Sequence, residues 1–396
     1  MQTEHRVLFQ PDAALNALAP GSVDLVVTSP PYPMIEMWDA SFGMQDSRIT
    51  AELAEGNGPE AFELMHRLLD TVWSGCMRVL RPGGFACINI GDATRTLGAG
   101  FRLYCNHSRV TTACEKLGFQ SLPLILWRKQ TNAPNKFMGS GMLPAGAYVT
   151  LEHEYILVLR KGGKRVFDAT EKQQRARSAF FWEERNSWFS DIWDFKGVQQ
   201  RLPANEARKR SGAFPFELAF RLIHMYSMQQ DLVLDPFVGS GTTTVAALAA
   251  GRSSLGLELQ PGLQSIIEAT IADASQRIND RQLQRLYDHE RFVHQYRASR
   301  GHEPQYRNEP HGFAVVTRQE QQLVLPAVTG LQRVDELHYR ADHGQLEPHS
   351  AHVLTRAAGS LKRSQQAGDE PGAQLGLWAA DQSPAAATRS GVHRGD

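Results

Sequence analysis

The chain has 396 residues, of which 42% are hydrophobic, and its 42 Lys and Arg residues are balanced by 42 Asp and Glu residues. This composition is typical of a globular protein with an apolar core, and it excludes a chain that is disordered throughout, a fibrous protein and a uniformly polycationic nucleic-acid coat. No apolar run approaches the ~18 residues of a membrane span and the N-terminus has no apolar secretory segment, so we expect a cytoplasmic protein of two or three structural units.

The first part of the chain alternates strand and helix signals. Runs of β-branched and other apolar residues predict buried strands, and apolar residues three or four positions apart predict helices. Strands are expected at 6–9, 23–28, 85–90, 122–127 and 153–160, and helices at 13–18, 60–79 and 110–117. Residues 33–58 show no clear period and are expected to form a long loop. This alternation predicts an α/β fold with a mostly parallel sheet.

A basic and aromatic segment interrupts the alternation. Residues 160–210 contain thirteen Lys or Arg and seven Asp or Glu, a net charge of +6, and seven aromatic residues fall between Phe180 and Phe195. Such a charge would supply contacts to nucleic-acid phosphates. We interpret most of the aromatic residues as the packing of a small subdomain.

The α/β pattern then resumes and fades. Helices are expected at 216–228, 242–250 and 262–300, and strands at 231–237, 254–257 and 322–326. Gly251 is placed to end the second of these helices. The last residues are rich in Ala, Ser, Gly and Gln and are expected to be a flexible tail, because their apolar content is too low to form a core.

The four cysteines all lie in the first third of the chain. They form no CxxC pair and no zinc-type spacing with histidine, and disulfides are rare in intracellular proteins. We therefore expect buried, unmodified cysteines and no metal site.

The strongest local motif is DPFVGSGTT at 235–243, where a predicted strand runs through a Gly-Ser-Gly turn into a helix. Glycines let the backbone approach a ligand, and a helix N-terminus presents free N–H groups to an anion. Glu258 ends the next strand, where doubly wound folds place a carboxylate for ribose hydroxyls. These features indicate an adenosine-containing ligand, although a glycine turn without a ligand is an alternative. No Lys follows Gly241 as a P-loop requires, and Thr244 replaces the third glycine of a dinucleotide fingerprint.

A second motif, Ser29-Pro30-Pro31-Tyr32, ends the predicted strand 23–28. Two successive prolines fix φ and remove two backbone donors, so the Pro30 carbonyl is held rigid as an acceptor. Ser29 adds a hydroxyl acceptor, and Tyr32 adds a flat stacking face. Two acceptors beside an aromatic ring suit a planar base with an exocyclic amino group. Taken alone, the tetrapeptide could also be a plain Pro-Pro turn.

Together, the two motifs in this order resemble the β group of S-adenosylmethionine-dependent DNA amino-methyltransferases, a circularly permuted version of the Rossmann-like methyltransferase fold. The resemblance covers roughly residues 5–275 and includes HEYI at 153–156 and DIW at 191–193. It implies S-adenosyl-L-methionine as cofactor and a mostly parallel seven-stranded sheet. The implied catalytic residues are Ser29, Pro30, Pro31 and Tyr32. The implied cofactor-binding residues are Asp12, Phe214, Pro215, Asp235, Pro236, Phe237, Gly239, Ser240, Gly241, Thr242, Thr243 and Glu258.

The resemblance also assigns parts of the chain. The expected parts are a catalytic half (1–160), a target-recognition region (161–210), a cofactor-binding half (211–275), a mixed extension (276–345) and a tail (346–396). The cofactor loop would surround the methionine part of the cofactor, with Phe214 and Pro215 closing over that end. Glu258 would hold the ribose. Asp12 would lie near the adenine, although this chain has Pro11-Asp12 where the family usually has Gly-Asp.

The implied reaction is methyl transfer to a base of double-stranded DNA. The base would be flipped out of the duplex and stacked on Tyr32, with its amine held by Ser29 and the Pro30 carbonyl. Serine at the first position of the tetrapeptide is associated in this family with N4-cytosine, and aspartate or asparagine with N6-adenine. Ser29 therefore points to the exocyclic N4 of cytosine as the target. Ring-carbon methylation would need a cysteine nucleophile, usually after proline, and no cysteine here follows one.

Several alternatives remain open. They are N6-adenine methylation by the same fold, methylation of RNA, an inactive nucleic-acid binder that kept the cofactor pocket, and a nicotinamide-dependent oxidoreductase. The oxidoreductase leaves the tetrapeptide at 29–32 unexplained, and the intact motifs disfavour the inactive binder. Members of the family are frequently homodimers, and a companion restriction endonuclease is possible; the sequence decides neither point.

Overall fold

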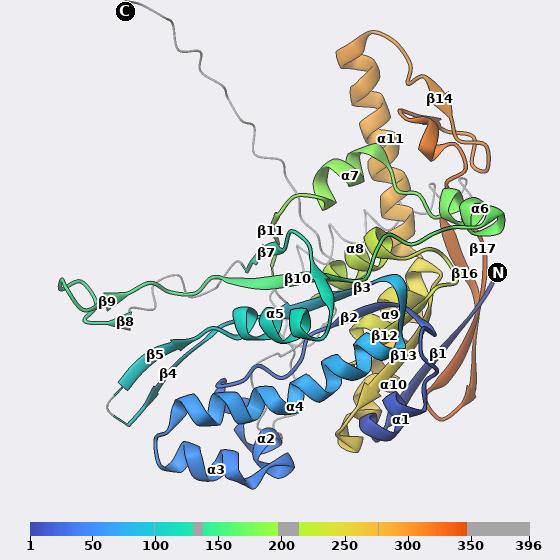
Figure 1. The fold of residues 1–396 in the computed structure, drawn as a ribbon. Coiled ribbons are helices and arrows are strands. Elements are labelled where there is room, and N and C mark those ends of the chain that lie inside the picture. The colour runs from blue at the N-terminus through green and yellow to red at the C-terminus, as the bar shows by residue number, and fades with distance from the viewer. Residues whose placement is uncertain (99, 130–137, 197–213, 276, 347–396) are drawn as a thin grey trace, which may run out of the picture.

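A single large β-sheet runs through the centre of the computed structural model, which describes residues 1–98, 100–129, 138–196, 214–275 and 277–346 (Figure 1). Its strands are β1 (Gln2–Phe9), β2 (Val23–Thr28), β3 (Leu80–Ile90), β6 (Phe119–Ser121), β7 (Ile125–Arg128), β10 (His153–Lys161), β11 (Ile192–Asp194), β12 (Leu232–Asp235), β13 (Ser253–Glu258), β16 (Pro326–Asp335) and β17 (His338–Gln345). The order is β11-β7-β10-β3-β2-β12-β13-β1-β17-β16, and β6 pairs with β10.

Helices cover both faces of the sheet. They are α1 (Pro11–Ala17), α2 (Asp39–Gln45), α3 (Ser47–Ala54), α4 (Gly58–Val79), α5 (Asn106–Lys116), α6 (Ala169–Arg177), α7 (Trp182–Trp188), α8 (Phe216–Tyr226), α9 (Thr242–Ala250), α10 (Gln264–Ser275) and α11 (Asp280–Arg300), with short 3-10 turns η1 (Glu36–Trp38), η2 (Pro261–Leu263) and η3 (Arg318–Glu320). One apolar core lies under α1, α4 and α5 and the other under α8, α9 and α10. This arrangement confirms the predicted α/β class.

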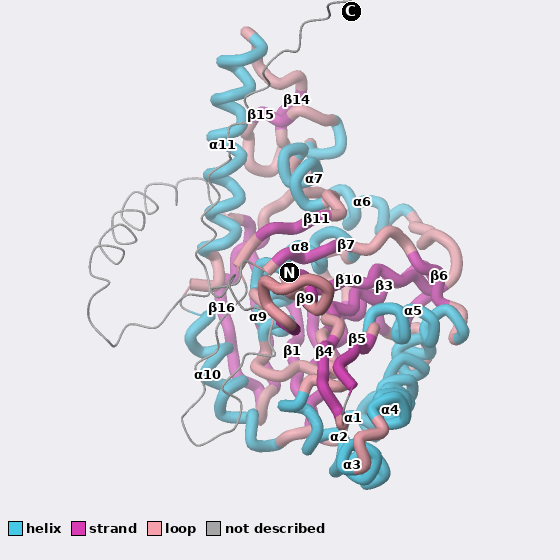
Figure 2. Tube along the Cα trace, turned by 90° about the vertical axis from the view of Figure 1, so that its left-hand side faces the viewer, coloured by secondary structure: helices cyan, strands magenta, loops and turns pink. Residues whose placement is uncertain are grey.

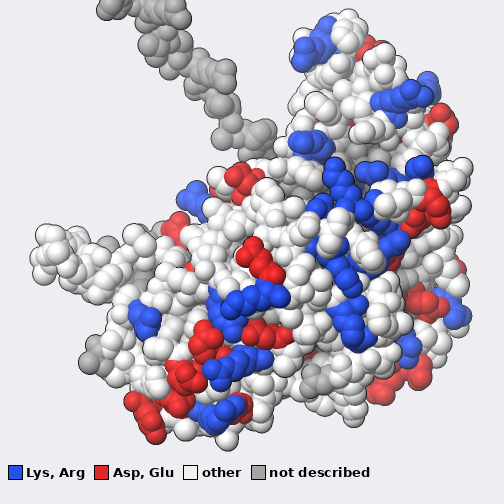
Figure 3. Space-filling model, viewed as in Figure 1, with Lys and Arg blue, Asp and Glu red and all other residues white. Residues whose placement is uncertain are grey.

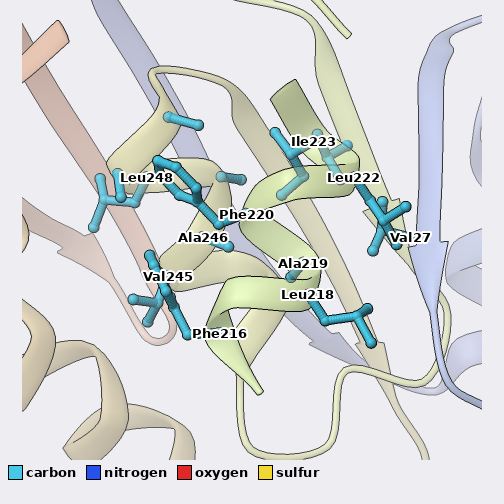
Figure 4. Close-up of a cluster of buried hydrophobic side chains, with 14 of the residues drawn as sticks. Val27, Phe216, Leu218, Ala219, Phe220, Leu222, Ile223, Val245, Ala246 and Leu248 are labelled. Atoms are coloured by element: carbon cyan, nitrogen blue, oxygen red, sulfur yellow. The ribbon is translucent and has the colours of Figure 1, made fainter. Parts of the chain in front are cut away.

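The central strands are parallel and buried on both sides. In β2, Val23, Leu25, Val26 and Val27 are all fully buried, as expected of a strand that has helices on each face. Alternate residues point into the two cores, so that Val27 meets α8 (Figure 4) while Val26 faces the α4 side. The small side chains of α9 let it pack closely against both the sheet and its neighbour α8.

The direction of the strands determines which residues meet at each edge of the sheet. β1, β13, β12, β2 and β3 are parallel, so their carboxyl ends lie at one edge. β10 is antiparallel to β3 and to β7, so its first residues and the last residues of β7 lie at that same edge. We call this the carboxyl edge and the opposite one the amino edge.

Several predicted elements are wrong. The expected loop 33–58 contains η1, α2 and α3, which are held by buried Phe42 and Ile49. The expected helix 262–300 is interrupted between α10 and α11. The expected strand 322–326 is irregular, because Leu323 and Leu325 point into an apolar cluster beneath α7 and α11.

The sheet also has more strands than the seven expected. β17 adds antiparallel to β1 and pairs with β16, so a hairpin of the C-terminal extension widens the sheet, and β11 and the short β6 add to the other side. The extension also contains β14 (Tyr306–Arg307) and β15 (Ala314–Val315), and α11 projects beyond the sheet (Figure 2). Residues 347–396, nearly all of the expected flexible tail, lie outside the described residues. Within the described part, no helix has the length and apolar character of a membrane span.

Candidate active site

A cavity of about 150 Å³ opens at the carboxyl edge, where β2 and β12 end side by side. It brings together residues from both motifs, which are about two hundred positions apart in the sequence. The predicted site residues that line it are Ser29, Pro31, Phe214, Pro236, Phe237, Gly239, Ser240, Thr242 and Glu258. Those that do not line it are Pro30, Tyr32, Pro215, Asp235, Gly241 and Thr243. Asp12 lies in α1, and its side chain is not among those described.

The glycine turn and Glu258 form one unit. Gly239 and Gly241 have φ values of 55° and 90°, a left-handed conformation that glycine adopts without strain, and the chain then enters α9. Gly239 N donates to Glu258 Oε2 at 3.0 Å, and Gln260 N donates to Oε1 at 2.9 Å. The Glu258 carboxylate is therefore anchored by the backbone on both oxygens before any ligand is present.

Asp235 connects the two motifs. Its carboxylate accepts hydrogen bonds from Thr28 Oγ1 at 2.6 Å, from Thr243 Oγ1 at 2.5 Å and from Phe237 N at 3.0 Å. The side chain is 2% exposed, and burial raises its pKa to about 6. Asp235 thus ties the end of β2 to the glycine turn and to the start of α9 from beneath the cavity.

The tetrapeptide at 29–32 is held by a polar network on the side away from the glycine turn. Ser29 Oγ lies 3.1 Å from Tyr32 OH, which donates to Glu154 Oε2 at 2.9 Å. Asn89 Nδ2 donates to both Tyr32 OH and Glu154 Oε2, and Lys129 Nζ pairs with Glu154 Oε1. Burial and the Glu154 carboxylate raise the pKa of Tyr32 well above its usual value, so this hydroxyl keeps its proton.

A buried amide clamps the loop that follows the tetrapeptide. Asn106 Nδ2 donates to the carbonyls of Pro33 and Gly91, both at 3.0 Å, and Asn106 Oδ1 lies 3.0 Å from His66 Nε2. Burial lowers the pKa of His66 to about 3, so the ring is neutral. Because both amide hydrogens serve carbonyls, Oδ1 is the acceptor and His66 carries its proton on Nε2. The clamp fixes the exits of β2 and β3 against each other.

Comparison with known proteins identifies the family. Residues 23–269 match the family model described as DNA methylase, which comprises the N6 and N4 methyltransferases. The chain belongs to this DNA methylase family. It is 49% identical over 328 residues to the type II methyltransferase M.MthZI of Methanothermobacter thermautotrophicus, covering 82% of this chain and 91% of that protein. It is 46% identical over 287 residues to the type II methyltransferase M.MjaI of Methanocaldococcus jannaschii, covering 70% and 94%.

A solved structure agrees with this assignment. The putative DNA modification methylase TTHA0409 from Thermus thermophilus, in complex with S-adenosyl-L-methionine, is 32% identical and superimposes with a TM-score of 0.53, covering 68% of this chain and 95% of that one. The resemblance to S-adenosylmethionine-dependent DNA amino-methyltransferases predicted from the two motifs is therefore confirmed.

The residues around the cavity fit S-adenosylmethionine, the cofactor of the methylase family. Glu258 offers an anchored carboxylate for ribose hydroxyls, and Leu263 and Ile266 supply apolar walls near it. Ser29 lies in the wall of the same cavity. A ligand held by Glu258 can thus reach the tetrapeptide without leaving the cavity.

Sequence reasoning missed several residues that line the methylase cavity. Met37, Trp38, Ser41 and Gln45 come from η1 and α2, in the segment predicted to be a loop. The recurrence of Trp38, Phe42 and Gln45 at helical spacing was the available signal, although such a short pattern is weak. Glu154, Asn89 and Lys129 were also missed, because only the fold brings β3, β7 and β10 to the tetrapeptide.

The basic segment of the methylase lies mainly at the other edge. Lys161 Nζ donates to the carbonyls of Arg78 and Leu80, where β3 begins. Arg165 pairs with Asp231 and Asp24, at the amino ends of β12 and β2. Basic side chains gather on that side of the molecule near α6 (Figure 3). Lys161 and Arg165 of the expected recognition region therefore lie at the amino edge, opposite the edge at which the cavity opens.

The segment reaches the carboxyl edge only as it ends. There β11 pairs with β7, with Asp194 opposite Arg128, and residues 197–213 lie outside the described residues. Phe181, Trp188 and Trp193 are buried, and Phe180 and Phe195 pack partly buried against the apolar core, whereas Trp182 and Phe189 are exposed. Five of the seven aromatic residues of this segment therefore serve packing, as expected.

Proposed function

We propose that this DNA methylase transfers the methyl group of S-adenosylmethionine to the exocyclic N4 of cytosine in double-stranded DNA. The observation that supports the proposal is Ser29, a neutral hydroxyl in the wall of the cavity. The next residue, Pro30, would supply the second acceptor, a carbonyl that two successive prolines hold rigid. Within the β group, serine at this position is associated with N4-cytosine, whereas aspartate or asparagine is associated with N6-adenine.

The site would act by position and by fixed dipoles. The amine of cytosine is a poor nucleophile because its lone pair is delocalised into the ring. Hydrogen bonds from its two N–H groups to Ser29 Oγ and to the Pro30 carbonyl favour a pyramidal nitrogen with a localised pair. The nitrogen then attacks the methyl carbon in line, the carbon–sulfur bond breaks with its electron pair on sulfur, and the nitrogen loses one proton to water. A duplex base reaches the site only after it is flipped out of the stack, at a cost of a few kcal/mol.

We also infer that the protein is a type II modification enzyme that acts beside a companion restriction endonuclease. The support is the identity of 49% and 46% to two proteins named as type II methyltransferases. That it forms a homodimer stays a prediction from the family.

The proposed function is tested by identifying the methylated nucleoside. The protein is incubated with radiolabelled S-adenosylmethionine and genomic duplex DNA, and the DNA is digested to nucleosides. N4-methylcytosine is expected. Labelled N6-methyladenine would refute the choice of base, and label in RNA alone would refute the substrate. Ser29→Ala is expected to lower turnover at least about 100-fold while it leaves cofactor affinity within about threefold, since it removes an acceptor that is used in the transfer.

A further inference from the structure

The hydroxyl of Ser29 begins a chain of hydrogen bonds that leads away from the cavity. The chain runs from Ser29 Oγ to Tyr32 OH at 3.1 Å and on to Glu154 Oε2 at 2.9 Å. Glu154 is 8% exposed, and the chain of hydrogen bonds ends where its carboxylate pairs with the partly exposed ammonium of Lys129. Asn89 Nδ2 donates to Tyr32 OH at 2.8 Å and to Glu154 Oε2 at 2.6 Å, so one amide group serves both oxygens.

Counting hydrogens gives this chain a direction. A tyrosine hydroxyl has one hydrogen, and a carboxylate has none. Glu154, paired with Lys129, can only accept, so the hydrogen of Tyr32 points to Glu154. The contact between Ser29 and Tyr32 is then made with the hydrogen of Ser29. The lone pairs of Ser29 Oγ are left to face the cavity.

We infer that Glu154 is a positioning residue that sets the direction of the Ser29 hydroxyl through Tyr32, so that only acceptors face the target amine. The inference rests on the proposed transfer to an exocyclic amine. Both hydrogens of that amine need acceptors, and a hydroxyl free to rotate could turn its own hydrogen toward them. The hydroxyl hydrogen of Ser29 would then face an N–H of the amine, and the amine would lack an acceptor at the step where its nitrogen must become nucleophilic.

The geometry argues against a simpler, purely structural role. Lys129 alone would neutralise Glu154, and Asn89 alone would satisfy one of its oxygens. Tyr32 OH nevertheless donates a further hydrogen bond to Glu154 at 2.9 Å, and the same hydroxyl contacts Ser29. Glu154 does not touch Ser29, so any effect on the serine has to pass through Tyr32. That requirement makes the inference testable by combining substitutions.

The test compares Glu154→Leu, which removes the acceptor, with Glu154→Gln, whose amide oxygen can still accept from Tyr32. Glu154→Leu is expected to lower kcat on the order of 100-fold, the usual effect of losing one oriented hydrogen-bonding group in an active site. Glu154→Gln is expected to recover most of that loss. KM for DNA and the Kd of S-adenosylmethionine, measured by calorimetry, should each stay within about threefold of the parent protein, since neither ligand contacts Glu154 in the proposal.

A double-substitution cycle supplies the decisive measurement. In the Tyr32→Phe background, which already interrupts the chain, Glu154→Leu should cost no more than about threefold further in kcat. Tyr155→Phe is the matched control, because it removes a phenol hydroxyl from the residue next to Glu154 but outside the chain, and it should leave kcat unchanged. Tyr32→Phe is also the fallback where Glu154→Leu lowers the yield of folded protein, because it interrupts the same chain of hydrogen bonds and is expected to reduce kcat about 100-fold by itself.

Two results would overturn the inference. One is a kcat loss for Glu154→Gln as large as that for Glu154→Leu, which would mean that charge and not an acceptor is needed. The other is a full, additive effect of Glu154→Leu in the Tyr32→Phe background. Failure of the proposed base choice would look different, because N6-methyladenine as product leaves the cycle interpretable: adenine also presents an amine with two N–H groups.

Discussion

Replacing Glu258 by alanine should weaken binding of S-adenosylmethionine about 150-fold. The carboxylate accepts Gly239 N at 3.0 Å and Gln260 N at 2.9 Å, and it lies in the cavity wall. A hydrogen bond to a charged group contributes about 1.5–3 kcal/mol, and the substitution removes both backbone bonds as well as the contact to the ribose. Because the turn can partly rearrange in the free protein, we expect about 3 kcal/mol to appear as lost affinity, which corresponds to roughly a 150-fold higher Kd.

Isothermal titration calorimetry of the cofactor measures this change directly. Glu290→Ala, at an exposed position of α11, is the matched control and should leave Kd unaltered. Glu258→Gln should give an intermediate Kd, because an amide can satisfy only one of the two backbone N–H groups. A Kd for Glu258→Ala within about threefold of the parent value would refute the assignment of Glu258 to the cofactor and the reasoning from its two backbone bonds.

Three further predictions concern other parts of the molecule. Gly91→Ala would place a Cβ 3.0 Å from Tyr32 Cε2 and 3.3 Å from Glu154 Cγ, so kcat should fall about tenfold with cofactor Kd unchanged in calorimetry. Burial raises the pKa of Asp235 from 3.8 to about 6, so its stabilising contribution is complete below about pH 4 and is lost as pH rises through 6. Urea unfolding should therefore show the stability of the parent relative to Asp235→Asn decreasing by about 2 kcal/mol between pH 4 and 7, and a constant difference would contradict this. The hairpins β4–β5 (Ala93–Leu97, Gly100–Tyr104) and β8–β9 (Met138–Gly139, Ala147–Tyr148) project from the carboxyl edge (Figure 1), and the rings of Phe101 and Tyr148 stack there with their centroids 4.6 Å apart. Replacing both residues by alanine should raise KM for DNA about tenfold in methyl-transfer assays. An unchanged KM would exclude these hairpins from DNA binding.

The parts of the site that could be predicted are those whose chemistry is local in the sequence. The glycine turn at 239–241 needs left-handed φ values, and only a few residue types allow them, so the motif carries its own structure. The tetrapeptide at 29–32 follows a strand whose β-branched run is unmistakable. Each motif directly follows a predicted strand, so it lies at the carboxyl end of that strand. Because the two strands are parallel neighbours, residues of both motifs line the same cavity.

The parts that could not be predicted depend on strand direction and on tertiary packing. An apolar run such as 153–160 reads the same whether the strand runs up or down the sheet. Only because β10 is antiparallel does Glu154, near its start, meet Tyr32 at the carboxyl edge. The helix α2 has one fully buried apolar residue, Phe42, and its position over the cavity follows from packing against α3 and not from its own period. The +6 charge of the basic segment predicted affinity for phosphate but carried no information on which edge it would occupy.

The order of strands divides the site into two halves that meet where β2 pairs with β12, and one buried side-chain hydrogen bond forms a joint between them there. On one side, β12 and β13 carry the glycine turn and Glu258, which would hold the cofactor; on the other, β2, β3 and β10 carry the tetrapeptide and the network that directs it. The direct side-chain link from β2 to the glycine turn is Thr28 to Asp235, buried beneath both. Substitutions on the first side should therefore appear in cofactor Kd and those on the second in kcat. Thr28→Val, which breaks the joint while it preserves shape, should change both, and a variant that moved only one of them would show that the halves are aligned by the backbone alone.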